Sequence, residues 1–415
     1  MDLEEMKSKL EKYHQTHVIE AYNRGNDVTK KVLLEQVNRI DFEQLQKLYA
    51  KTKEEIQLGE MQIEPLPYVD PEKISKEEKE QYITRGKEII HSGKLAVVTM
   101  AGGQGTRLGH NGPKGTFDIG LSSHKSLFEI LTNYLKDVSM KYETKIPWYI
   151  MTSRENNADT VHFFEEHQFF GYPSDACMFF KQGELPMLDE QGKVIISEEG
   201  IIKEAADGHG GIFEAIFREG ILEDMKARGI EWIFVGSVDN PLVKMADPLF
   251  IGYAESNQYM VASKTLVKAY PEEKVGVFCK KNGKPYVIEY TEISKEMANE
   301  RDANGELVYG ESHVLLNLFN IQTLEKIKEV KLPYHCAHKK SNLVDEKGNV
   351  IVPEEPNAYK FETFIFDAFS LIPTMGLLRG KREDDFAPVK NATGTDSPET
   401  ARKLVEDYNQ RHRSE

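Results

Sequence analysis

The fold of this chain is decided by one stretch, Leu95-Ala-Val-Val-Thr-Met-Ala-Gly-Gly-Gln-Gly-Thr-Arg-Leu-Gly109. Its beginning, Leu95–Met100, is a short apolar run that is typical of a buried strand. The strand is followed by four glycines within eight residues: Gly102, Gly103, Gly105 and Gly109. Glycine has no Cβ and accepts positive φ, so the backbone can turn tightly and present its N–H groups to a ligand. Concave arrays of backbone N–H groups bind anions, most often phosphate.

Two cationic side chains accompany the glycine loop. Arg107 lies within it, and Lys114 follows in the string Pro113-Lys114-Gly115. An arginine holds phosphate oxygens with a planar fork, whereas a lysine acts as a point charge. A strand, a glycine loop and two nearby cations together predict a site for a polyphosphate.

Two common phosphate motifs fit the loop less well. A P-loop requires G-x-x-x-x-G-K-[ST], and this string does not occur in the sequence. A dinucleotide fingerprint needs a third glycine where this chain has Leu108, and an acid for the ribose after the next strand. The next apolar run, Pro147–Met151, is followed by Thr152-Ser153-Arg154 instead. A dehydrogenase is therefore the weaker interpretation.

The composition excludes some classes of partner. The 415-residue chain has a formal net charge of −15, and its charges are spread along the sequence. Nucleic acids and anionic membranes call for a basic face, so we expect neither as a partner. The three cysteines are far apart, which favours a reducing, cytoplasmic setting over a disulfide framework. The acidic N-terminus and the lack of a long apolar run predict neither a secretory signal nor a membrane span.

Strand-like and helix-like patterns alternate after the glycine loop, and this predicts a mostly parallel sheet with helices on both faces. The first 60 or so residues show leucines at helical spacing. We therefore expect an α/β fold with three segments. These are an N-terminal helical region and linker (1–70), a catalytic domain (71–390) and a C-terminal helix or tail (391–415).

Some local boundaries are also predicted. The capping-box pattern Ser75-Lys-Glu-Glu78 indicates the start of a helix that ends before Gly93. A single helix is expected over about 212–228. The pair Asn282-Gly283 between two apolar runs indicates a β-hairpin.

Polar residues outside the loop suggest further parts of a site. Asp207-Gly-His-Gly-Gly211 is a second glycine-rich loop at a predicted helix start, where we favour ligand contact over a plain connection. Asp239 follows a buried strand, either to hold Mg²⁺ near phosphates or to cap a turn. Glu289 closes the hairpin, where its position alone indicates an edge charge. His335 and His338 lack further ligands at the usual spacing, which argues against a metal pair.

The inventory favours one class of reaction. The sequence contains no G-x-S-x-G and no H-E-x-x-H string, so neither a serine nucleophile nor a zinc protease site is indicated. Cations, one well-placed acid and two glycine loops suit phosphoryl or nucleotidyl transfer, in which positioning and charge neutralisation supply most of the catalysis.

The string Ala101–Gly109 with Pro113-Lys114-Gly115 resembles the signature of eukaryotic-type UDP-sugar pyrophosphorylases, and most closely their N-acetylhexosamine branch. Similar blocks continue in family order from about residue 60 to about residue 405. They are Phe180-Lys-Gln-Gly183, Ala206-Asp-Gly-His-Gly-Gly211, Ser237-Val-Asp-Asn240, Val275-Gly-Val277, Val287-Ile-Glu-Tyr290, Lys360-Phe-Glu-Thr-Phe-Ile-Phe-Asp367 and Phe386-Ala-Pro-Val-Lys-Asn391.

The resemblance implies a Rossmann-like, GT-A-like nucleotidyltransferase that uses Mg²⁺. It would make a UDP-sugar and pyrophosphate from UTP and a sugar 1-phosphate, first of all N-acetylglucosamine 1-phosphate. A glucose 1-phosphate or broad-specificity enzyme is the alternative, and a non-catalytic UDP-sugar sensor is the rival from another class. A monomer or weak homo-oligomer is expected.

The resemblance also implies roles for particular residues. The catalytic cations would be Arg107, Lys114 and Lys390, and the metal ligand would be Asp239. The nucleotide would be bound by Ala101, Gly102, Gly103, Gln104, Gly105, Thr106, Gln182 and Gly208. The sugar and its phosphate would be bound by His209, Gly276, Glu289, Asn317 and Lys360.

Two positions depart from the N-acetylhexosamine branch. His209 stands where that branch has asparagine, and relatives that use glucose also carry histidine there. Ser312-His313 aligns with a Gly-Asn pair, which is lost unless Asn317 takes its place. Both changes weaken the N-acetyl assignment without overturning it.

Overall fold

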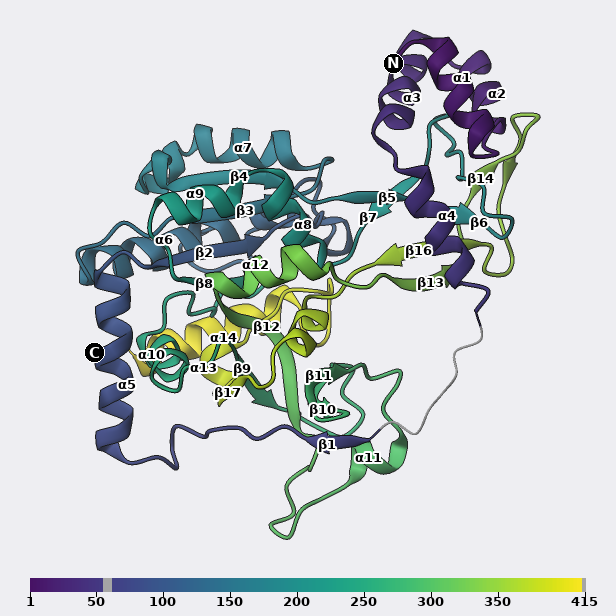
Figure 1. Ribbon diagram of the computed structural model, residues 1–415. Coiled ribbons are helices and arrows are strands. Elements are labelled where there is room, and N and C mark those ends of the chain that lie inside the picture. The colour runs from purple at the N-terminus through teal and green to yellow at the C-terminus, as the bar shows by residue number, and fades with distance from the viewer. Residues whose placement is uncertain (55–61, 413–415) are drawn as a thin grey trace. The chain divides into compact units, whose positions relative to one another are not determined.

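The computed structural model describes residues 1–54 and 62–412 (Figure 1). The chain divides into two compact units, which we describe separately. Unit 1 comprises Met1–Gly59, Gly183–Gly211 and Leu332–Phe364, and unit 2 comprises Glu60–Gln182, Ile212–Lys331 and Ile365–Glu415.

The described part of unit 2 is built on a ten-stranded mixed sheet with the strand order β1-β10-β12-β8-β2-β3-β4, in which β11 pairs with β10 and β9 pairs with β12 and β17. The four strands β8, β2, β3 and β4 run parallel to one another. The strands are β1 (Ile63–Pro65), β2 (Leu95–Met100), β3 (Trp148–Thr152), β4 (Cys177–Lys181), β8 (Trp232–Ser237), β9 (Val261–Val267), β10 (Val277–Lys281), β11 (Lys284–Ile288), β12 (Glu311–Asn320) and β17 (Gly376–Arg379).

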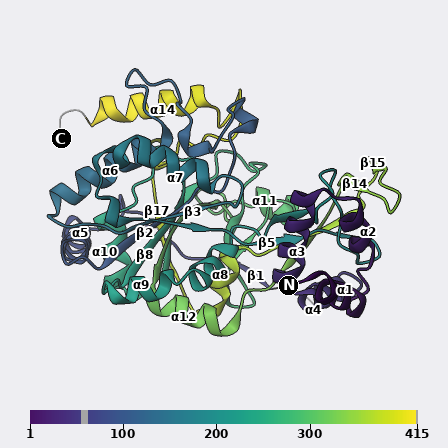
Figure 2. The same cartoon turned by 90° about the horizontal axis from the view of Figure 1, so that it is seen from above.

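Helices cover both faces of this sheet. In Figure 2, α6 and α7 lie on one side of β2, β3 and β8, while α9 and α12 lie on the other. The described helices that lie in unit 2 or lead into it are α5 (Lys76–His91), α6 (Leu127–Lys141), α7 (Asn157–Glu166), α8 (Gly211–Arg218), α9 (Ile221–Ala227), α10 (Pro248–Ser256), α11 (Lys295–Asn299), α12 (Ile321–Val330), α13 (Arg382–Asp385) and α14 (Pro398–Arg411). Short 3-10 turns complete the unit: η1 (Thr106–Leu108), η2 (Lys114–Thr116), η3 (Gln168–Gly171), η4 (Ser174–Ala176) and η5 (Ile365–Leu371).

The central strands are apolar because both of their faces are covered. All residues of β2 and β3 are buried, and the side chains of Trp148 and Trp232 are at most 1% exposed. A parallel strand between two helical layers has no solvent face, which explains the unbroken apolar run that indicated β2. The predicted α/β fold with a mostly parallel core is confirmed.

The helix before β2 begins and ends where the sequence indicated. The hydroxyl of Ser75 accepts a hydrogen bond from the N–H of Glu78, which caps the start of α5. Gly93 has φ +70°, a conformation that glycine adopts without strain, and it leads the chain into β2. The hairpin prediction is also confirmed, since Asn282 (φ +51°) and Gly283 (φ +76°) connect β10 to β11.

The single helix expected over 212–228 is wrong. The structure has two helices here, α8 and α9, separated at Gly220, which has φ +72°. A left-handed residue cannot continue a right-handed helix, so the chain changes direction at this glycine.

Two glycines allow α5 and α10 to cross at backbone contact. A Cβ on Gly86 would lie 1.9 Å from the carbonyl oxygen of Pro248. A Cβ on Gly252 would lie 1.7 Å from the carbonyl oxygen of Tyr82. Any side chain at either position would push the two helices apart.

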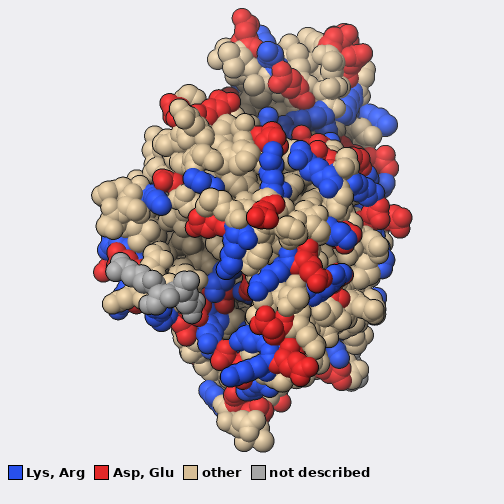
Figure 3. Space-filling model, turned by 90° about the vertical axis from the view of Figure 1, so that its left-hand side faces the viewer, with Lys and Arg blue, Asp and Glu red and all other residues tan. Residues whose placement is uncertain are grey.

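Charges of both signs are interspersed on the face of the molecule shown in Figure 3. Arg85 on α5, for example, pairs with Glu88 at 3.0 Å and with Glu255 at 2.9 Å. Such pairs neutralise charge locally, while the whole chain carries a formal net charge of −15.

Unit 1 is assembled from three separate stretches of sequence. Its described helices are α1 (Leu3–Lys12), α2 (His17–Arg24), α3 (Asp27–Arg39) and α4 (Phe42–Lys51). Its described strands form the sheet β13-β16-β6 and the pairs β14–β15 and β5–β7. These strands are β5 (Glu184–Pro186), β6 (Leu188–Asp189), β7 (Glu204–Ala206), β13 (His335–Lys339), β14 (Leu343–Val344), β15 (Val350–Ile351) and β16 (Ala358–Glu362).

Two buried glutamines connect the helices of unit 1 to its later segments. The side chain of Gln36 donates to the carbonyl oxygen of Ile202 at 2.8 Å and accepts from its N–H at 2.9 Å. Gln15 accepts from the N–H of Val194 at 2.9 Å. These contacts join stretches that we had not expected to belong together, because our segments 1–70, 71–390 and 391–415 are contiguous. Residues 55–61 of the expected helical region and linker lie outside the described residues.

No helix in the described ranges is both long and apolar enough to cross a membrane. The three cysteines are free thiols: Cys177 and Cys279 are buried, and Cys336 is exposed.

Candidate active site

The glycine loop and Asp239 leave the sheet at the same edge. Met100, the last residue of β2, is in register with Ser237 on β8 and with Met151 on β3. The next hydrogen bonds continue this pattern, since the N–H of Ala101 donates to Met151 O at 2.7 Å. Because the strands are parallel, their carboxyl ends meet here, which is the usual position for a ligand site in such sheets.

The loop folds back on itself and brings Lys114 next to its beginning. The N–H of Gly105 donates to Gly112 O at 2.9 Å, and the N–H of Lys114 donates to Gly103 O at 3.0 Å. A Cβ on Gly105 would lie 2.7 Å from the ring of His110, so only glycine fits this closure. The exposed side chain of Arg107 stands on η1 between these contacts.

Asn156 fastens the loop to the sheet, and the sequence analysis missed it. Its side chain is 0% exposed, and its Nδ2 donates to Ala101 O at 3.0 Å and to Gly103 O at 3.3 Å. Its Oδ1 accepts from the N–H of Ser153 at 2.8 Å. The available signal was its position just after β3, at the edge where the glycine loop lies.

Gln182 reaches the loop from the end of β4. Its N–H donates to Thr152 O at 2.8 Å, which places it at the same edge of the sheet. Its side-chain oxygen would lie 3.1 Å from a Cβ on Gly102, so the amide lies over the glycine loop. The structure therefore brings this predicted uracil contact next to the predicted nucleotide loop.

Lys114, Asp239 and the segment that carries Lys390 also meet at this edge. Lys114 Nζ lies 3.9 Å from Asp239 Oδ2, and each side chain is 19% exposed. The N–H of Val389 donates to Asp239 O at 2.9 Å, so Lys390 follows directly. Lys390 Nζ lies 3.7 Å from Asp396 Oδ2, and its side chain is 49% exposed. The charges of Lys114 and Asp239 are thus neighbours, the backbone next to Lys390 lies beside Asp239, and all three side chains are within reach of solvent.

A second group of predicted residues gathers around β12. A Cβ on Gly276 would lie 3.5 Å from Glu289 Oε1, so this carboxylate lies next to the glycine. The N–H of His313 donates to Gly276 O at 2.9 Å. His313 Nε2 lies 3.3 Å from Asn317 Oδ1, which connects Asn317 to the same group.

A β-bulge in β12 produces this arrangement. The register of β12 against β9 shifts between His313 and Asn317, and Leu315 between them has φ +58°. Bulges redirect side chains and are common beside active sites. Ser263 Oγ donates to Asn317 Oδ1, whereas Asn317 Nδ2 is buried and has no acceptor among the described residues. This buried donor therefore remains unsatisfied among the described residues.

The remaining predicted residues, Gly208, His209 and Lys360, belong to unit 1. Gly208 has φ +86°, and a Cβ there would lie 2.3 Å from Thr363 O, so its backbone approaches the chain after β16 closely. The ring of His209 lies 5.3 Å from that of Phe364. Lys360 Nζ pairs with Glu362 Oε1 at 2.7 Å. These three residues therefore share one small region of unit 1.

The two histidines of the His335–His338 stretch are engaged in ring contacts. His335 stacks on Phe364 at 4.6 Å, and His338 stacks on Tyr359 at 4.8 Å. Within residues 1–54 and 62–412, no group of three or more His, Cys, Asp or Glu side chains could hold a metal ion.

The parallel sheet, the glycine loop and the charges at the sheet edge suit a nucleotidyltransferase. A sequence profile described as UTP–glucose-1-phosphate uridylyltransferase matches residues 40–395, and the chain belongs to this family. The predicted family is therefore confirmed.

The individual relatives are named for N-acetylglucosamine instead of glucose. The chain is 36% identical over 419 residues to UDP-N-acetylglucosamine diphosphorylase 2 of Arabidopsis thaliana, covering 96% of this chain and 82% of the relative. It is 40% identical over 357 residues to UDP-N-acetylglucosamine pyrophosphorylase of Saccharomyces cerevisiae, covering 82% and 75%. The crystal structure of uridine diphosphate N-acetylglucosamine pyrophosphorylase from Trypanosoma brucei superposes with a TM-score of 0.83 at 29% identity, covering 97% and 84%.

Proposed function

We propose that this chain transfers the uridylyl group of UTP to N-acetylglucosamine 1-phosphate and releases pyrophosphate. The observation that carries the proposal is the meeting of the glycine loop, Lys114 and Asp239 at one edge of the parallel sheet, with 3.9 Å between the ammonium and the carboxylate. The names of relatives with 36–40% identity supply the sugar.

The chemistry is an in-line displacement at phosphorus. A phosphate oxygen of the sugar 1-phosphate attacks the α-phosphorus of UTP, and the bond from this phosphorus to the bridging oxygen of pyrophosphate breaks. The attacking oxygen is already anionic, so no general base is required. The protein therefore acts by positioning and by neutralising charge.

We assign the charges as follows. Lys114 neutralises the α-phosphate, and Arg107, exposed on η1, contacts the departing phosphates. Lys390 holds the phosphoryl that is transferred, and Lys360 holds the phosphate of the sugar. In the structure the Nζ atoms of Lys114, Lys360 and Lys390 lie 3.9, 2.7 and 3.7 Å from a carboxylate oxygen.

Asp239 is the residue that we assign to Mg²⁺. One carboxylate beside a phosphate-binding loop suits Mg²⁺, which commonly takes one or two protein carboxylates and completes its shell with substrate phosphates and water. The exposure of the side chain, 19%, leaves an oxygen accessible from the site. When bound, the ion would supply charge neutralisation to both phosphates.

The base and the sugar have separate contacts in this proposal. The glycine loop from Ala101 to Thr106 holds the ribose and phosphates, and Gln182 and Gly208 read the uracil edge. On the side of β12, the carboxylate of Glu289 accepts hydrogen bonds from sugar hydroxyls. Gly276, Asn317 and His209 face the sugar.

His209 and His313 keep glucose 1-phosphate open as a second substrate, because both replace asparagine positions of the N-acetylhexosamine branch. Pyrophosphate release from UTP and Mg²⁺ with N-acetylglucosamine, N-acetylgalactosamine, glucose and galactose 1-phosphates decides between them. We expect the highest kcat/KM with N-acetylglucosamine 1-phosphate. UTP binding without turnover of any sugar would contradict the proposal and support a sensor.

We infer a cytoplasmic enzyme that acts as a monomer or weak homo-oligomer. The inference is supported by three cysteines that form no disulfide and by an acidic chain with interspersed charges. Sedimentation velocity at several protein concentrations tests the oligomeric part.

A further inference from the structure

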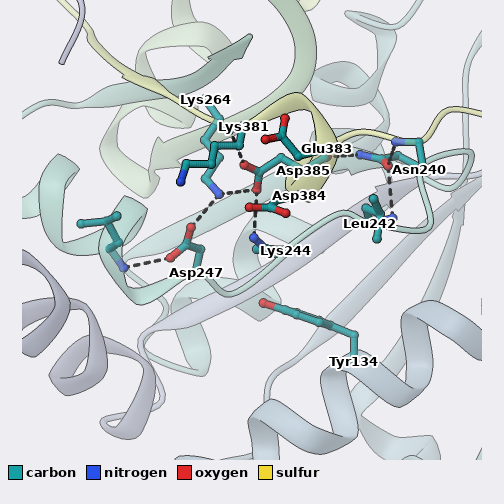
Figure 4. Close-up of polar contacts among 12 residues, drawn as sticks. Tyr134, Asn240, Leu242, Lys244, Asp247, Lys264, Lys381, Glu383, Asp384 and Asp385 are labelled. Carbon is teal, nitrogen blue, oxygen red and sulfur yellow. Dashed lines mark hydrogen bonds and ion pairs between the residues drawn. The ribbon is translucent and has the colours of Figure 1, made fainter. Parts of the chain in front are cut away.

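A buried cluster of ion pairs surrounds the carboxylate of Asp385, the last residue of α13 (Figure 4). Lys264 projects from β9, and its side chain is only 6% exposed. Lys264 Nζ lies 2.6 Å from Asp247 Oδ2 and 2.8 Å from Asp385 Oδ1. Lys244 Nζ lies 3.5 Å from the same oxygen of Asp385. Two lysines and two aspartates thus form one charge-balanced cluster.

The cluster fixes the position of Asp385 from several directions. Its carboxylate also accepts from the backbone N–H of Lys381 at 3.1 Å, so both of its oxygens are engaged. Asp385 is 4% exposed and ends α13. An apolar group of the same volume would fill this space without taking charges out of water, but it would not set the direction of the chain that leaves α13.

Asn240 connects the cluster to the active site. The amide of Asn240 donates to Asp385 O at 2.8 Å and accepts from the N–H of Ala387 at 2.9 Å and of Leu242 at 3.2 Å. Asn240 is 4% exposed and directly follows Asp239. Two residues beyond Ala387, the N–H of Val389 donates to Asp239 O at 2.9 Å. The strand end that carries Asp239 and the segment that carries Lys390 are therefore joined side by side.

The far side of Lys390 is also closed by hydrogen bonds. The N–H groups of Lys390 and Asn391 donate to Asp396 O at 2.7 and 3.0 Å. The segment from Asp385 to Asp396 is thus held at the cluster, at Asn240 and at its own turn. Of these anchors, only the cluster ties it to the rest of the sheet through a buried charge.

We propose that Lys264 and Asp385 are positioning residues that set the distance between Asp239 and Lys390. They contact neither substrate, and they act through Asn240 and the backbone of segment 385–389. The inference rests on the proposed function, because it gives Asp239 and Lys390 the metal and the phosphoryl group. Displacements of about 1 Å at a reacting centre reduce rates by up to about 100-fold, so small shifts of this segment have a measurable effect.

The test compares two Asp→Asn variants of the full chain. Asp385→Asn alters the cluster. Asp224→Asn is the matched control, because Asp224 accepts a hydrogen bond from the buried Tyr149 and pairs with Arg228 but has no contact with the site. Three quantities are measured: kcat, the KM for UTP, and the affinity of the UTP-loaded chain for Mn²⁺ by titration calorimetry.

The expected result separates position from stability. Asp385→Asn lowers kcat by about 10- to 100-fold, leaves the KM for UTP nearly unchanged and weakens Mn²⁺ binding. Asp224→Asn changes neither kcat nor Mn²⁺ affinity. Wild-type kcat and Mn²⁺ affinity in a folded Asp385→Asn would overturn the proposal.

A second variant tests the proposal if Asp385→Asn fails to fold. Lys264→Met/Asp385→Leu removes one charge of each sign and keeps apolar volume, so it is expected to fold. The same loss of kcat and of Mn²⁺ affinity is expected, and wild-type values of both would overturn the proposal. A wild type that binds Mn²⁺ and UTP without turnover contradicts the proposed function, while the Mn²⁺ affinities of the variants still decide the positioning role. A wild type that binds no Mn²⁺ with UTP overturns both.

Discussion

Two lysine–aspartate pairs in unit 2 use the same chemical groups for different purposes. Lys114 and Asp239 are 3.9 Å apart, and both side chains are 19% exposed. Lys264 and Asp385 are 2.8 Å apart, and both side chains are 6% exposed. The first pair stands at the mouth of the glycine loop, and the second lies within the protein.

The difference shows how burial decides what an ion pair can do. A loose, partly exposed pair is weak and can be replaced by a phosphate at little cost. A buried pair cannot separate, because either charge alone would remain out of water. The Lys114–Asp239 pair can therefore exchange its contact for a ligand, whereas the Lys264–Asp385 pair keeps the backbone in a fixed position.

The largest expected effect is on stability. Lys264→Met leaves Asp247 and Asp385 without their common buried cation and should lower the free energy of unfolding by about 3–5 kcal/mol. Urea unfolding followed by tryptophan fluorescence measures it, because both tryptophans, Trp148 and Trp232, lie in the sheet of unit 2.

The control for this effect is the charge-balanced variant Lys264→Met/Asp385→Leu, which should recover most of the lost stability. Lys114→Met should change stability by less than about 1 kcal/mol. Equal losses at Lys264 and Lys114 would refute the distinction between the two pairs.

The second effect is on catalysis. Lys114→Ala removes a preorganised charge from the transferring phosphate and should reduce kcat by about 10²–10³-fold. Pyrophosphate release at saturating UTP, Mg²⁺ and N-acetylglucosamine 1-phosphate measures it. Lys145→Ala, which removes a surface partner of Asp175, serves as the control and should leave kcat unchanged. A folded Lys114→Ala with wild-type kcat would exclude Lys114 from the mechanism.

A smaller effect, on the KM for the sugar 1-phosphate, is expected at the partly exposed Lys360–Glu362 pair of unit 1. Lys360 Nζ lies 2.7 Å from Glu362 Oε1, and the two side chains are 21% and 23% exposed. Glu362→Gln removes the carboxylate that competes with the phosphate, so the KM for the sugar 1-phosphate should fall about two- to fivefold. Lys360→Met should raise the same KM. An increase of KM in Glu362→Gln would instead make Glu362 a substrate contact.

The smallest effect is on the pH dependence of stability. Burial would raise the pKa of Asp385, but Lys264 and Lys244 outweigh it, and the pKa lies below its ordinary value. The stability that this carboxylate contributes is complete above the ordinary aspartate pKa, about 3.9, and is lost as the pH falls through the folded value.

The stability of the wild type relative to Lys264→Met/Asp385→Leu should therefore be constant between about pH 5 and pH 8 and decline below about pH 4. Urea titrations at each pH give this difference. A decline that begins near neutral pH would mean that another group supports the cluster.

Local chemistry explains what the sequence predicted well. The strand at Leu95–Met100, the helix between Ser75 and Gly93 and the Asn282-Gly283 turn each carry their own backbone or burial signal. The neighbourhood of Lys114 and Asp239 followed from parallel strands, because Asp239 comes just after β8 and Lys114 follows the glycine loop that leaves β2. The chemical roles of these residues stay predictions.

Contacts between distant segments explain what was missed. Lys264 stands in the strand string Val-Ala-Ser-Lys-Thr-Leu-Val, where a lysine normally indicates a solvent face, and only the distant Asp247 and Asp385 make its burial tolerable. Asn156 carries no motif, and the block that ends at Asn240 assigned that residue no role, because the value of both lies in the backbone groups that other segments bring to them. The bulge at Leu315 could not be predicted, because no glycine marks its position in the sequence.

The crossing of α5 and α10 at Gly86 and Gly252 has a consequence for anyone who engineers this scaffold. Helix α10 begins at Pro248 and is capped by Asp247, whose carboxylate also binds Lys264. A bulkier residue at either glycine would displace α10 and, through Asp247, would also displace the buried Lys264. Libraries that randomise α5 should therefore keep Gly86, since the packing change it prevents would be transmitted through the protein interior to the proposed active site.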